Sequence, residues 1–532
     1  MTQRKTQTLA YWQKQFSVDS QDKEFIYNRI LEENRLFTFD EIAVGLIKRR
    51  CDAEELESRA ELQQGRLYQP KEHYEVGEKI VFSSFDYAVG TVEYSREGTH
   101  PDYGKFMVVG VKFESDGSSH EFSTQFNHDH PLNGSDQVLS NIHGLLSPEE
   151  LYQTYRNTIH SKIKTNLDSS VEFVEFHGQY FLRDLLTELH EGLFNIADAA
   201  IDINNGPLGI DALITQMGLL KKGEEVTDLL RFSVSYRLET DERFEDVGPT
   251  GQSLWYLERL EPPEARHTPR RLQMKAAESY DVGLFDDNLY VLLSEIDDEA
   301  THPDDIPAVG PEISEITVGL NYPHHRVGTL PLTPKTESFF PISHYNPVRF
   351  QFVDGQTGDT FPGWVVLAGK YVFGLGEWYS KNQLPVGAYL KIKRTKDPLR
   401  IIVDFEPTRT QRDWIRTAAA SNNRLTFQMN KEAIGCKYDD LMIVSERSLT
   451  EMDSLWLNAE EKEWSIYNLL CDIFPQLSKL NPQSTVHAKT LYSAVNMVRR
   501  ASPGIVFQEL VERDAFIPVD HGYWVYDSNL RD

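Results

Sequence analysis

Apolar residues recur every three or four positions in many parts of the chain, which is the spacing of one buried face of an α-helix. The pattern predicts helices over residues 21–31, 39–50, 147–163, 181–200, 210–220, 226–238, 411–419, 460–480, 486–500 and 502–513. The third of these has a clear start, because Ser147 can cap the first turn, Pro148 suits its first position and Glu150 completes a capping box.

Two other blocks alternate apolar and polar residues over short runs separated by Gly and Pro, which indicates half-buried strands joined by turns. The first block has runs at 76–82, 88–94, 105–113 and 120–124, and the second has runs at 361–367, 370–379 and 384–394. Short strands at this spacing favour small β-barrels. We therefore predict barrels over residues 71–140 and 327–406.

One short pattern occurs twice, far apart in the chain. Phe244 and Val247 precede a turn with Gly and an apolar run around Trp255. Phe516 and Val519 precede a similar turn and a run around Trp524. Both copies follow a helical pattern, and a helix followed by two strands with a buried Trp is how a winged-helix module ends. We expect both Trp side chains to be core residues.

The predicted fold is therefore α+β and multidomain, with winged-helix-like helical modules alternating with small β-barrels. A chain of 532 residues is too long for one core. We expect an N-terminal helical module, a small β-barrel, a winged-helix-like module, an acidic linker, a pseudobarrel-like barrel and a C-terminal winged-helix-like module, at residues 1–70, 71–140, 145–275, 276–326, 327–406 and 407–532.

The composition indicates a protein of the cytoplasm. No apolar run reaches the length of about eighteen residues that a membrane span needs, and the first residues lack the apolar core of a signal peptide. Cys51, Cys436 and Cys471 form no C-x-x-C pair, so we expect reduced thiols and no cysteine zinc site.

The charge balance is acidic, with 82 Asp and Glu against 54 Lys and Arg and a net charge of −28. This excess disfavours wrapping of naked DNA, because Lys and Arg supply most of the non-specific affinity for phosphate. Residues 276–315 hold twelve acidic and no basic side chains. We interpret this segment as a solvated linker, with a docking surface for a basic partner as the alternative.

A basic stretch interrupts this background, and Tyr389 and Trp414 interleave with it. Cations on such a stretch can meet phosphates while the aromatic rings stack on bases. The alternative is a solvated face that balances the acidic protein. A further Arg pair ends a predicted helix, where either phosphate or the helix dipole suits it. The predicted nucleic-acid-binding residues are Lys391, Lys393, Arg394, Lys396, Arg400, Arg409, Arg412, Arg416, Arg499 and Arg500.

Signatures of catalysis are missing from the sequence. It contains no G-x-x-x-x-G-K-[ST] loop, no H-E-x-x-H and no G-x-S-x-G. His128 and His130 have the residue type of metal ligands, but they lie on a predicted turn and are interpreted, like His324 and His325, as loop residues. We expect no catalytic residue, no metal and no cofactor.

Three parts of the chain resemble known families. The runs 76–82, 90–92 and 111–117 are similar to Tudor or KOW-like barrels, which dock on proteins or nucleic acid. Residues 384–389, Leu-Pro-Val-Gly-Ala-Tyr, resemble DNA-binding pseudobarrels, although no signature for base contacts accompanies them. The C-terminal helices with Phe516 and Trp524 resemble the winged-helix (HARE-type) domain of the delta subunit of bacterial RNA polymerase.

These resemblances imply transcription and DNA binding rather than catalysis. The leading hypothesis is a non-enzymatic cytoplasmic protein that binds DNA or RNA polymerase and acts in transcription or its regulation. A protein–protein scaffold that docks basic partners through its acidic surface is the alternative. A nucleic-acid-processing enzyme is a third possibility, and it would need carboxylates that converge in space.

Overall fold

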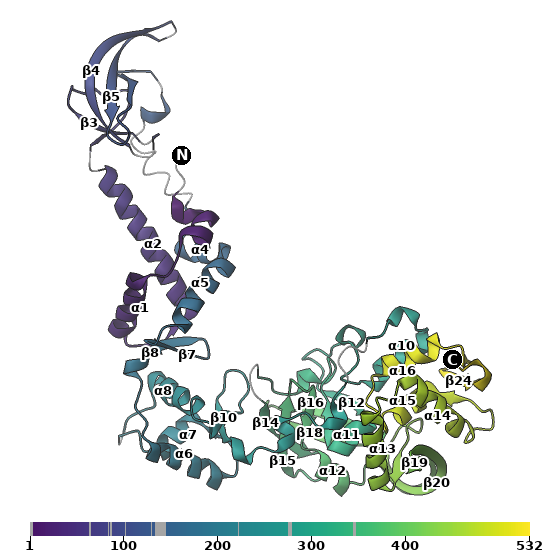
Figure 1. Ribbon diagram of the computed structural model, residues 1–532. Helices are drawn as coiled ribbons and strands as arrows, with labels where there is room; N and C mark the ends of the chain where they lie inside the picture. Colours follow the sequence, from purple (N-terminus) through teal and green to yellow (C-terminus); the bar gives the residue numbers. More distant parts are fainter. Residues whose placement is uncertain are drawn as a thin grey trace. The chain divides into compact units, whose positions relative to one another are not determined.

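The computed structural model describes residues 4–62, 65–82, 84–85, 88–101, 103–128, 130–133, 145–221, 223–274, 279–343 and 347–531 (Figure 1). The chain is a mixed α and β protein with several sheets, and it divides into two compact units. Unit 1 comprises residues 1–188 and 225–236, and unit 2 comprises residues 189–224 and 237–532. Among the described residues, no helix combines the length and the apolar character that a membrane crossing requires.

The helical part of unit 1 surrounds one core, in which Trp12, Leu46 and Phe181 are buried. Its sheet has β8 between β1 and β7, with antiparallel pairing on both sides. The predicted start at Ser147 is confirmed, with the capping box in place. The elements are α1 (Ser20–Glu33), β1 (Phe37–Thr38), α2 (Phe39–Leu62), α4 (Pro148–Thr154), α5 (Arg156–Asp168), β7 (Phe173–Phe176) and β8 (Gln179–Leu182).

A second sheet is inserted into this part of unit 1, between α2 and α4. Its five strands pair in chain order around a core that contains Tyr74, Phe82 and Val109. The hydrogen-bonded order runs from β2 at one edge to β6 at the other, as in an open sheet rather than a closed barrel. The strands are β2 (Arg66–Leu67), β3 (Lys79–Phe82), β4 (Ala88–His100), β5 (Gly104–Phe113) and β6 (Ser119–Thr124).

A three-stranded sheet with its helices follows, and it contains the first copy of the repeated Trp pattern. Trp255 is fully buried, as predicted. The helix predicted from residue 181 begins instead at Glu191, because Phe181 and Leu182 pair in β8. The elements in unit 2 are α6 (Glu191–Asn204), β9 (Leu208–Gly209), α7 (Ile210–Gln216), β10 (Phe244–Asp246) and β11 (Leu254–Leu257), and β11 lies between β9 and β10. The helix that precedes β10 in the chain, α8 (Asp228–Glu239), has most of its residues in unit 1, where Phe232 belongs to the core.

A seven-stranded sheet forms the middle of unit 2 and pairs in the order β12-β17-β18-β14-β15-β16-β13. All described pairs are antiparallel except β14 with β18. The strands are β12 (Glu315–Gly319), β13 (Thr329–Pro331), β14 (Val348–Asp354), β15 (Thr360–Val366), β16 (Tyr371–Phe373), β17 (Tyr389–Arg394) and β18 (Arg400–Phe405). Two short helices, α11 (Tyr322–Val327) and α12 (Gly376–Lys381), accompany them.

The segment interpreted as an acidic linker is folded over its described residues, 279–326. It contains α10 (Asp287–Ile296), whose Leu289, Leu293 and Ile296 are buried, and it supplies β12 to the seven-stranded sheet. The linker interpretation is therefore wrong there. The acidic composition misled this interpretation, because the segment also contains the buried apolar face of α10, and three of its acids, Asp297, Asp298 and Glu299, are themselves buried.

The C-terminal part begins with a long ribbon of β19 (Pro407–Ser421) and β20 (Arg424–Cys436), joined by β21 (Ser445–Arg447). The helix predicted over 411–419 is wrong, because these residues pair with β20 throughout. Cross-strand pairing here overrides the helical preference of three successive Ala. The remaining elements are α13 (Leu449–Glu461), α14 (Ile466–Ser478), β22 (Val486–His487), α15 (Ala488–Val495), α16 (Pro503–Glu512), β23 (Phe516–Pro518) and β24 (Tyr523–Tyr526), and β24 lies between β22 and β23.

One order of elements along the chain recurs three times within the described residues: helix, short strand, helix, one or two further helices, then two strands. In each copy the last strand is central in a three-stranded sheet, giving β1-β8-β7, β9-β11-β10 and β22-β24-β23. The sequence pattern indicates only the second and third copies. The first is hidden because the five-stranded sheet separates its two halves.

Candidate nucleic-acid interface

The β19–β20 ribbon brings basic and aromatic side chains onto one face. Trp414 stands directly opposite Lys431, Arg412 opposite Ala433, and Arg416 opposite Met429. Side chains two residues apart on a strand lie on the same face, and directly opposed side chains share that face. Arg412, Trp414, Arg416 and Lys431 therefore form one patch, which we call the ribbon patch.

The ribbon patch is exposed while the backbone beneath it is anchored. The Trp414 residue is 64% exposed, whereas Ile415 and Ile434, which point the other way, are buried in the core of the seven-stranded sheet. Further along the ribbon, Ala418 and Phe427 belong to the core of the C-terminal helices. An exposed Trp on a strand fixed at both ends is preorganised to stack on a flat ligand.

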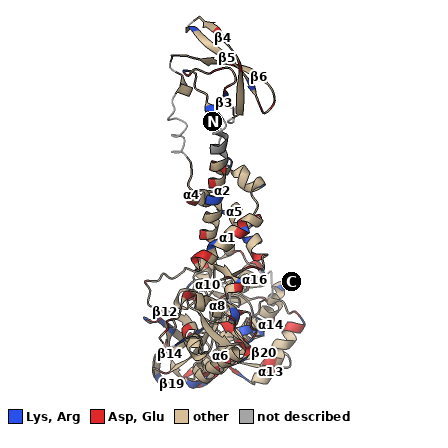
Figure 2. Ribbon diagram, turned by 90° about the vertical axis from the view of Figure 1, so that its left-hand side faces the viewer, with Lys and Arg blue, Asp and Glu red and all other residues tan. Residues whose placement is uncertain are grey.

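The charges on the ribbon are separated by face. Arg412 and Lys431 form no ion pair with any residue that the structure describes, and the Arg416 guanidinium donates to the carbonyl oxygen of Asp440. The nearest acids on the ribbon, Asp413 and Glu432, oppose each other on the other face. Figure 2 shows blue basic positions on the ribbon beside the label of β19.

Four of the predicted basic residues are instead committed to contacts within unit 2. Lys391 lies 4.0 Å from Glu406, and Lys393 lies 3.1 Å from Glu315 and 3.9 Å from Asp404. The Arg394 guanidinium donates to the carbonyl oxygens of Ile313 and Ser338 and lies over the ring of Phe339. Arg400 pairs with Asp397 at 3.7 Å. Of these four, Lys393 connects neighbouring strands of the seven-stranded sheet, whereas Lys396 and Arg409 are exposed.

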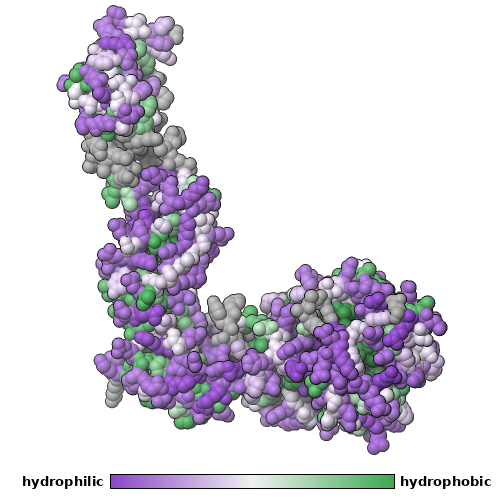
Figure 3. Space-filling view, in the orientation of Figure 1, coloured by the Kyte–Doolittle hydropathy of each residue, from purple (hydrophilic) through white to green (hydrophobic). Residues whose placement is uncertain are grey.

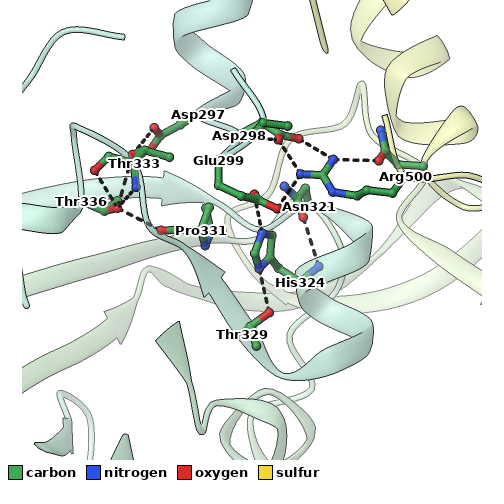
Figure 4. A network of polar contacts seen from close by, with 12 residues as sticks. Asp297, Asp298, Glu299, Asn321, His324, Thr329, Pro331, Thr333, Thr336 and Arg500 are labelled. Atoms are coloured by element: carbon green, nitrogen blue, oxygen red, sulfur yellow. Dashed lines mark hydrogen bonds and ion pairs between the residues drawn. The ribbon is translucent and has the colours of Figure 1, made fainter. Parts of the chain in front are cut away.

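The predicted helix-end pair Arg499 and Arg500 also points inward. Arg499 donates to the carbonyl oxygen of Trp464 at 2.7 Å. Arg500 has a side chain only 1% exposed and forms ion pairs with Asp298 and Glu299 (Figure 4). Phosphate cannot reach Arg500, so its assignment to a nucleic-acid site is corrected. The sequence did not indicate this ion pairing, because Asp298 and Glu299 lie in the segment that we interpreted as a linker.

The buried network extends from Arg500 to a histidine. Glu299 accepts from Arg500 and lies 2.8 Å from Nε2 of His324, whose Nδ1 lies 2.7 Å from the Thr329 hydroxyl (Figure 4). Burial by itself raises the pKa of the Glu299 carboxyl, but the charges of Arg500 and His324 hold it well below its usual range.

An acid, a histidine and a hydroxyl in a row are the parts of a nucleophilic triad. Here His324 and Thr329 are fully buried and Glu299 is nearly so, so a substrate has no access and the row is structural. The interpretation of His324 and His325 as loop residues is wrong. Both lie on α11, where Asn321 caps the helix, and His325 lies 2.9 Å from the carbonyl oxygen of Leu384.

Metal binding finds no support in the described part of the chain, where no three His, Cys, Asp or Glu side chains converge suitably. His130 Nδ1 accepts from the backbone of Leu132, and a ring nitrogen of His128 lies 3.2 Å from the carbonyl oxygen of Tyr103. The three cysteines are free. The surface seen in Figure 3 is mostly hydrophilic, with apolar residues in small groups, so polar sites are the better candidates.

Sequence reasoning missed Lys431 as a partner of Trp414, because the two are on different strands. The turn residues Asn422 and Asn423 both have positive φ, 48° and 61°. Two such Asn residues between alternating runs are the signal of a two-residue hairpin, which fixes the register of every pair along the ribbon. Read this way, the sequence would have placed residue 431 opposite residue 414.

No family model, no curated protein and no solved structure matches this chain.

Proposed function

We propose that the protein binds DNA through the ribbon patch and acts, without catalysis, in transcription or its regulation. The single observation that carries this proposal is an exposed Trp414 surrounded by Arg412, Arg416 and Lys431, with the acids of the ribbon on the opposite face. A surface that binds single-stranded nucleic acid combines cations, which contact phosphates, with an aromatic ring, which stacks on a base.

The geometry favours bases that are unpaired. A Trp side chain on a strand cannot stack on a base inside an intact duplex, whereas a single strand or an opened duplex presents the flat face of its bases. The preferred ligand in this proposal is therefore single-stranded DNA or a locally opened duplex, as found where transcription begins.

The recurrent order of elements also supports a role in transcription. Helix, strand, helix, helix and two strands, with the last strand central, is the order expected of the winged-helix modules that the Trp patterns indicate. We propose that the three copies are winged-helix modules. The resemblance of the C-terminal copy to a polymerase subunit makes RNA polymerase the second partner to test, by a pull-down with the full chain.

The test is fluorescence anisotropy of the full chain with a labelled mixed-sequence single strand and with its duplex, at several salt concentrations. Three cations on phosphates give a slope of about −2 in log K against log salt for a single strand. The double variant Arg412→Glu with Lys431→Glu should abolish binding at low salt. Lys462→Glu with Lys479→Glu is the matched control, because both side chains are exposed in unit 2 and neither belongs to the strands of the ribbon.

Two results would reject the proposal. One is absence of binding to either probe at low salt. The other is equal loss of affinity in the ribbon variant and in the control variant, because that result would attribute binding to overall charge rather than to the ribbon patch.

A further inference from the structure

A second site lies in unit 2, at a cavity of about 960 Å³. Its walls come from the end of α8 and the residues after it, from β10, from the chain after β11 including the short helix α9 (Pro263–Arg266), and from the end of β15. Five of its side chains are glutamates: Glu239, Glu242, Glu245, Glu258 and Glu261.

The cavity is strongly acidic. The basic side chains among the described residues that line it are Arg266, which already pairs with Glu258, and His267. Phe244, Val366 and Leu367 supply an apolar wall beside the carboxylates. A cavity with several carboxylates and an apolar wall matches a ligand with a positive head and a hydrocarbon stem.

Glu261 is the residue that points to a missing ligand. It is only 7% exposed, and no donor group among the described residues reaches its carboxylate oxygens, so its side chain meets only another acid, the carboxyl group of Glu245, with which it shares a hydrogen bond when protonated. Its position is fixed by a hydrogen bond from its own backbone to the carbonyl oxygen of Glu258 and by the two prolines that follow. Two buried carboxyl groups in contact cannot both ionise without a positive charge beside them, and a cation in the cavity would supply that charge.

The electrostatic state of Glu261 agrees with this view. Burial, and then the neighbouring carboxylate of Glu245, raise the pKa of the Glu261 carboxyl to about 8. Glu258 raises that pKa further and Arg266 lowers it. At neutral pH the empty site therefore holds a proton that a bound cation would displace.

We propose that this cavity binds an organic cation, the ammonium or guanidinium group of a lysine-like or arginine-like ligand, with Glu261 and Glu245 as its counter-ions. The source of the group is a basic peptide segment of a partner protein or a free polyamine, which share this chemistry. A metal ion is disfavoured, because the described residues include no group of three converging metal ligands. The site is separate from the ribbon patch and does not depend on the proposed DNA binding.

The experiment is isothermal titration of the full chain with three probes: a blocked peptide of alternating Arg and Gly, the same peptide with citrulline in place of Arg, and spermidine. The Arg peptide or spermidine should bind, and the citrulline peptide should not. In wild type, binding at pH 7 should release protons, measured as a dependence of the heat on the ionisation enthalpy of the buffer.

Glu261→Gln keeps the size of the side chain and should weaken binding about ten-fold or more and abolish proton release. Glu461→Gln, exposed at the end of α13, is the matched control and should change neither. A melting curve of each variant shows whether it is folded. If Glu261→Gln is unfolded, Glu245→Gln takes its place, and if that variant is also unfolded, competition between spermidine and the Arg peptide in wild type tests the site.

The relative affinities of the Arg peptide and spermidine distinguish the two sources of the cation. Tighter binding of the peptide than of spermidine identifies a protein segment, and the reverse identifies a polyamine. Absence of heat with both cationic probes, equal affinity in Glu261→Gln, or equal binding of the citrulline peptide would overturn the proposal. DNA binding measured on the same Glu261→Gln sample should remain unchanged, which distinguishes failure of this site from failure of the ribbon patch.

Discussion

Arg500 and Asp298, which are 202 residues apart in sequence, meet in the interior of unit 2. Nη1 of Arg500 donates to Oδ2 of Asp298 at 2.9 Å, and Nη2 donates to the other carboxylate oxygen. The pair connects the chain between α15 and α16 with the segment after α10 (Figure 4). Both side chains are buried, so each depends on the other for its charge to be tolerated.

Removing one member of this pair should destabilise unit 2. We expect Arg500→Met to lower the free energy of unfolding by about 3–5 kcal/mol, because Asp298 and Glu299 would be left as uncompensated buried charges. Denaturant unfolding followed by circular dichroism measures the change. Lys479→Met, at an exposed position, should alter it by less than about 0.5 kcal/mol. A loss for Arg500→Met as small as that of the control would contradict the structural role.

Replacing Trp414 should weaken binding of nucleic acid without changing the stability of the fold. Trp414→Ala is expected to weaken binding of a single-stranded oligonucleotide by about 1–3 kcal/mol, the usual value of one base stacked on an aromatic ring. Because the side chain is largely exposed, the melting temperature should hardly change. Anisotropy and a thermal melt on the same sample test both points. Trp414→Phe retains a ring and should recover part of the affinity, and failure to recover would argue against stacking.

Glu261 should make stability fall as pH rises. Its pKa is raised to about 8 in the folded protein, above about 4.3 in the unfolded chain, so the folded state binds more protons between these values. The free energy of unfolding should therefore decrease from about pH 4.5 to about pH 8, by roughly 3–5 kcal/mol at full extent.

Glu261→Gln removes this titration, so the variant should gain stability over wild type at pH 8 but not at pH 4.5. Urea unfolding of both proteins across this range measures the difference. Parallel curves for the two proteins would show that Glu261 does not carry the shifted pKa.

His487 should give the opposite dependence at lower pH. Burial, and then the charge of Lys489, lower the pKa of its imidazole to about 4, although Asp439 and Glu295 act the other way. The imidazole of His487 binds a proton near pH 6.5 in the unfolded chain but not in the folded protein. Its contribution to the free energy of unfolding is therefore fully present above about pH 6.5 and is lost as the pH falls towards 4.

The NMR titration of the His487 ring should therefore show a mainly neutral imidazole at pH 5. His487→Gln should reduce the loss of stability between pH 6.5 and pH 4. A His487 ring that titrates near pH 6.5 would contradict this expectation.

The sequence predicts elements well where one face is buried and the pattern is local. The predicted runs 76–82, 105–113 and 384–394 contain the strands β3, β5 and β17, each of which contributes side chains to a core. The Trp patterns are local too, and Trp255 and Trp524 are buried as expected.

Prediction from the sequence is weaker where the structure of a segment depends on a residue far away in the chain. The Ala residues at 418–420 suit a helix, and only their pairing with residues 425–427 makes them a strand. Arg500 resembles a solvent-facing cation until Asp298 is known to be its partner, and the acids of residues 297–299 resemble a linker for the same reason. In the candidate site, the sequence alone indicated Arg412, Trp414 and Arg416, which lie on one strand. Lys431 could be assigned only from the register of the two strands.

The sheet inserted between α2 and α4 affects the order in which the parts of unit 1 can fold during synthesis. Phe37 pairs with Tyr180, so the N-terminal sheet cannot close until nearly all of unit 1 has left the ribosome. Strands β2 to β6 pair only with their neighbours in sequence and need no such wait. The inserted sheet is thus free to fold before its host, and an early stop in synthesis would leave a folded insert on an unfinished helical scaffold.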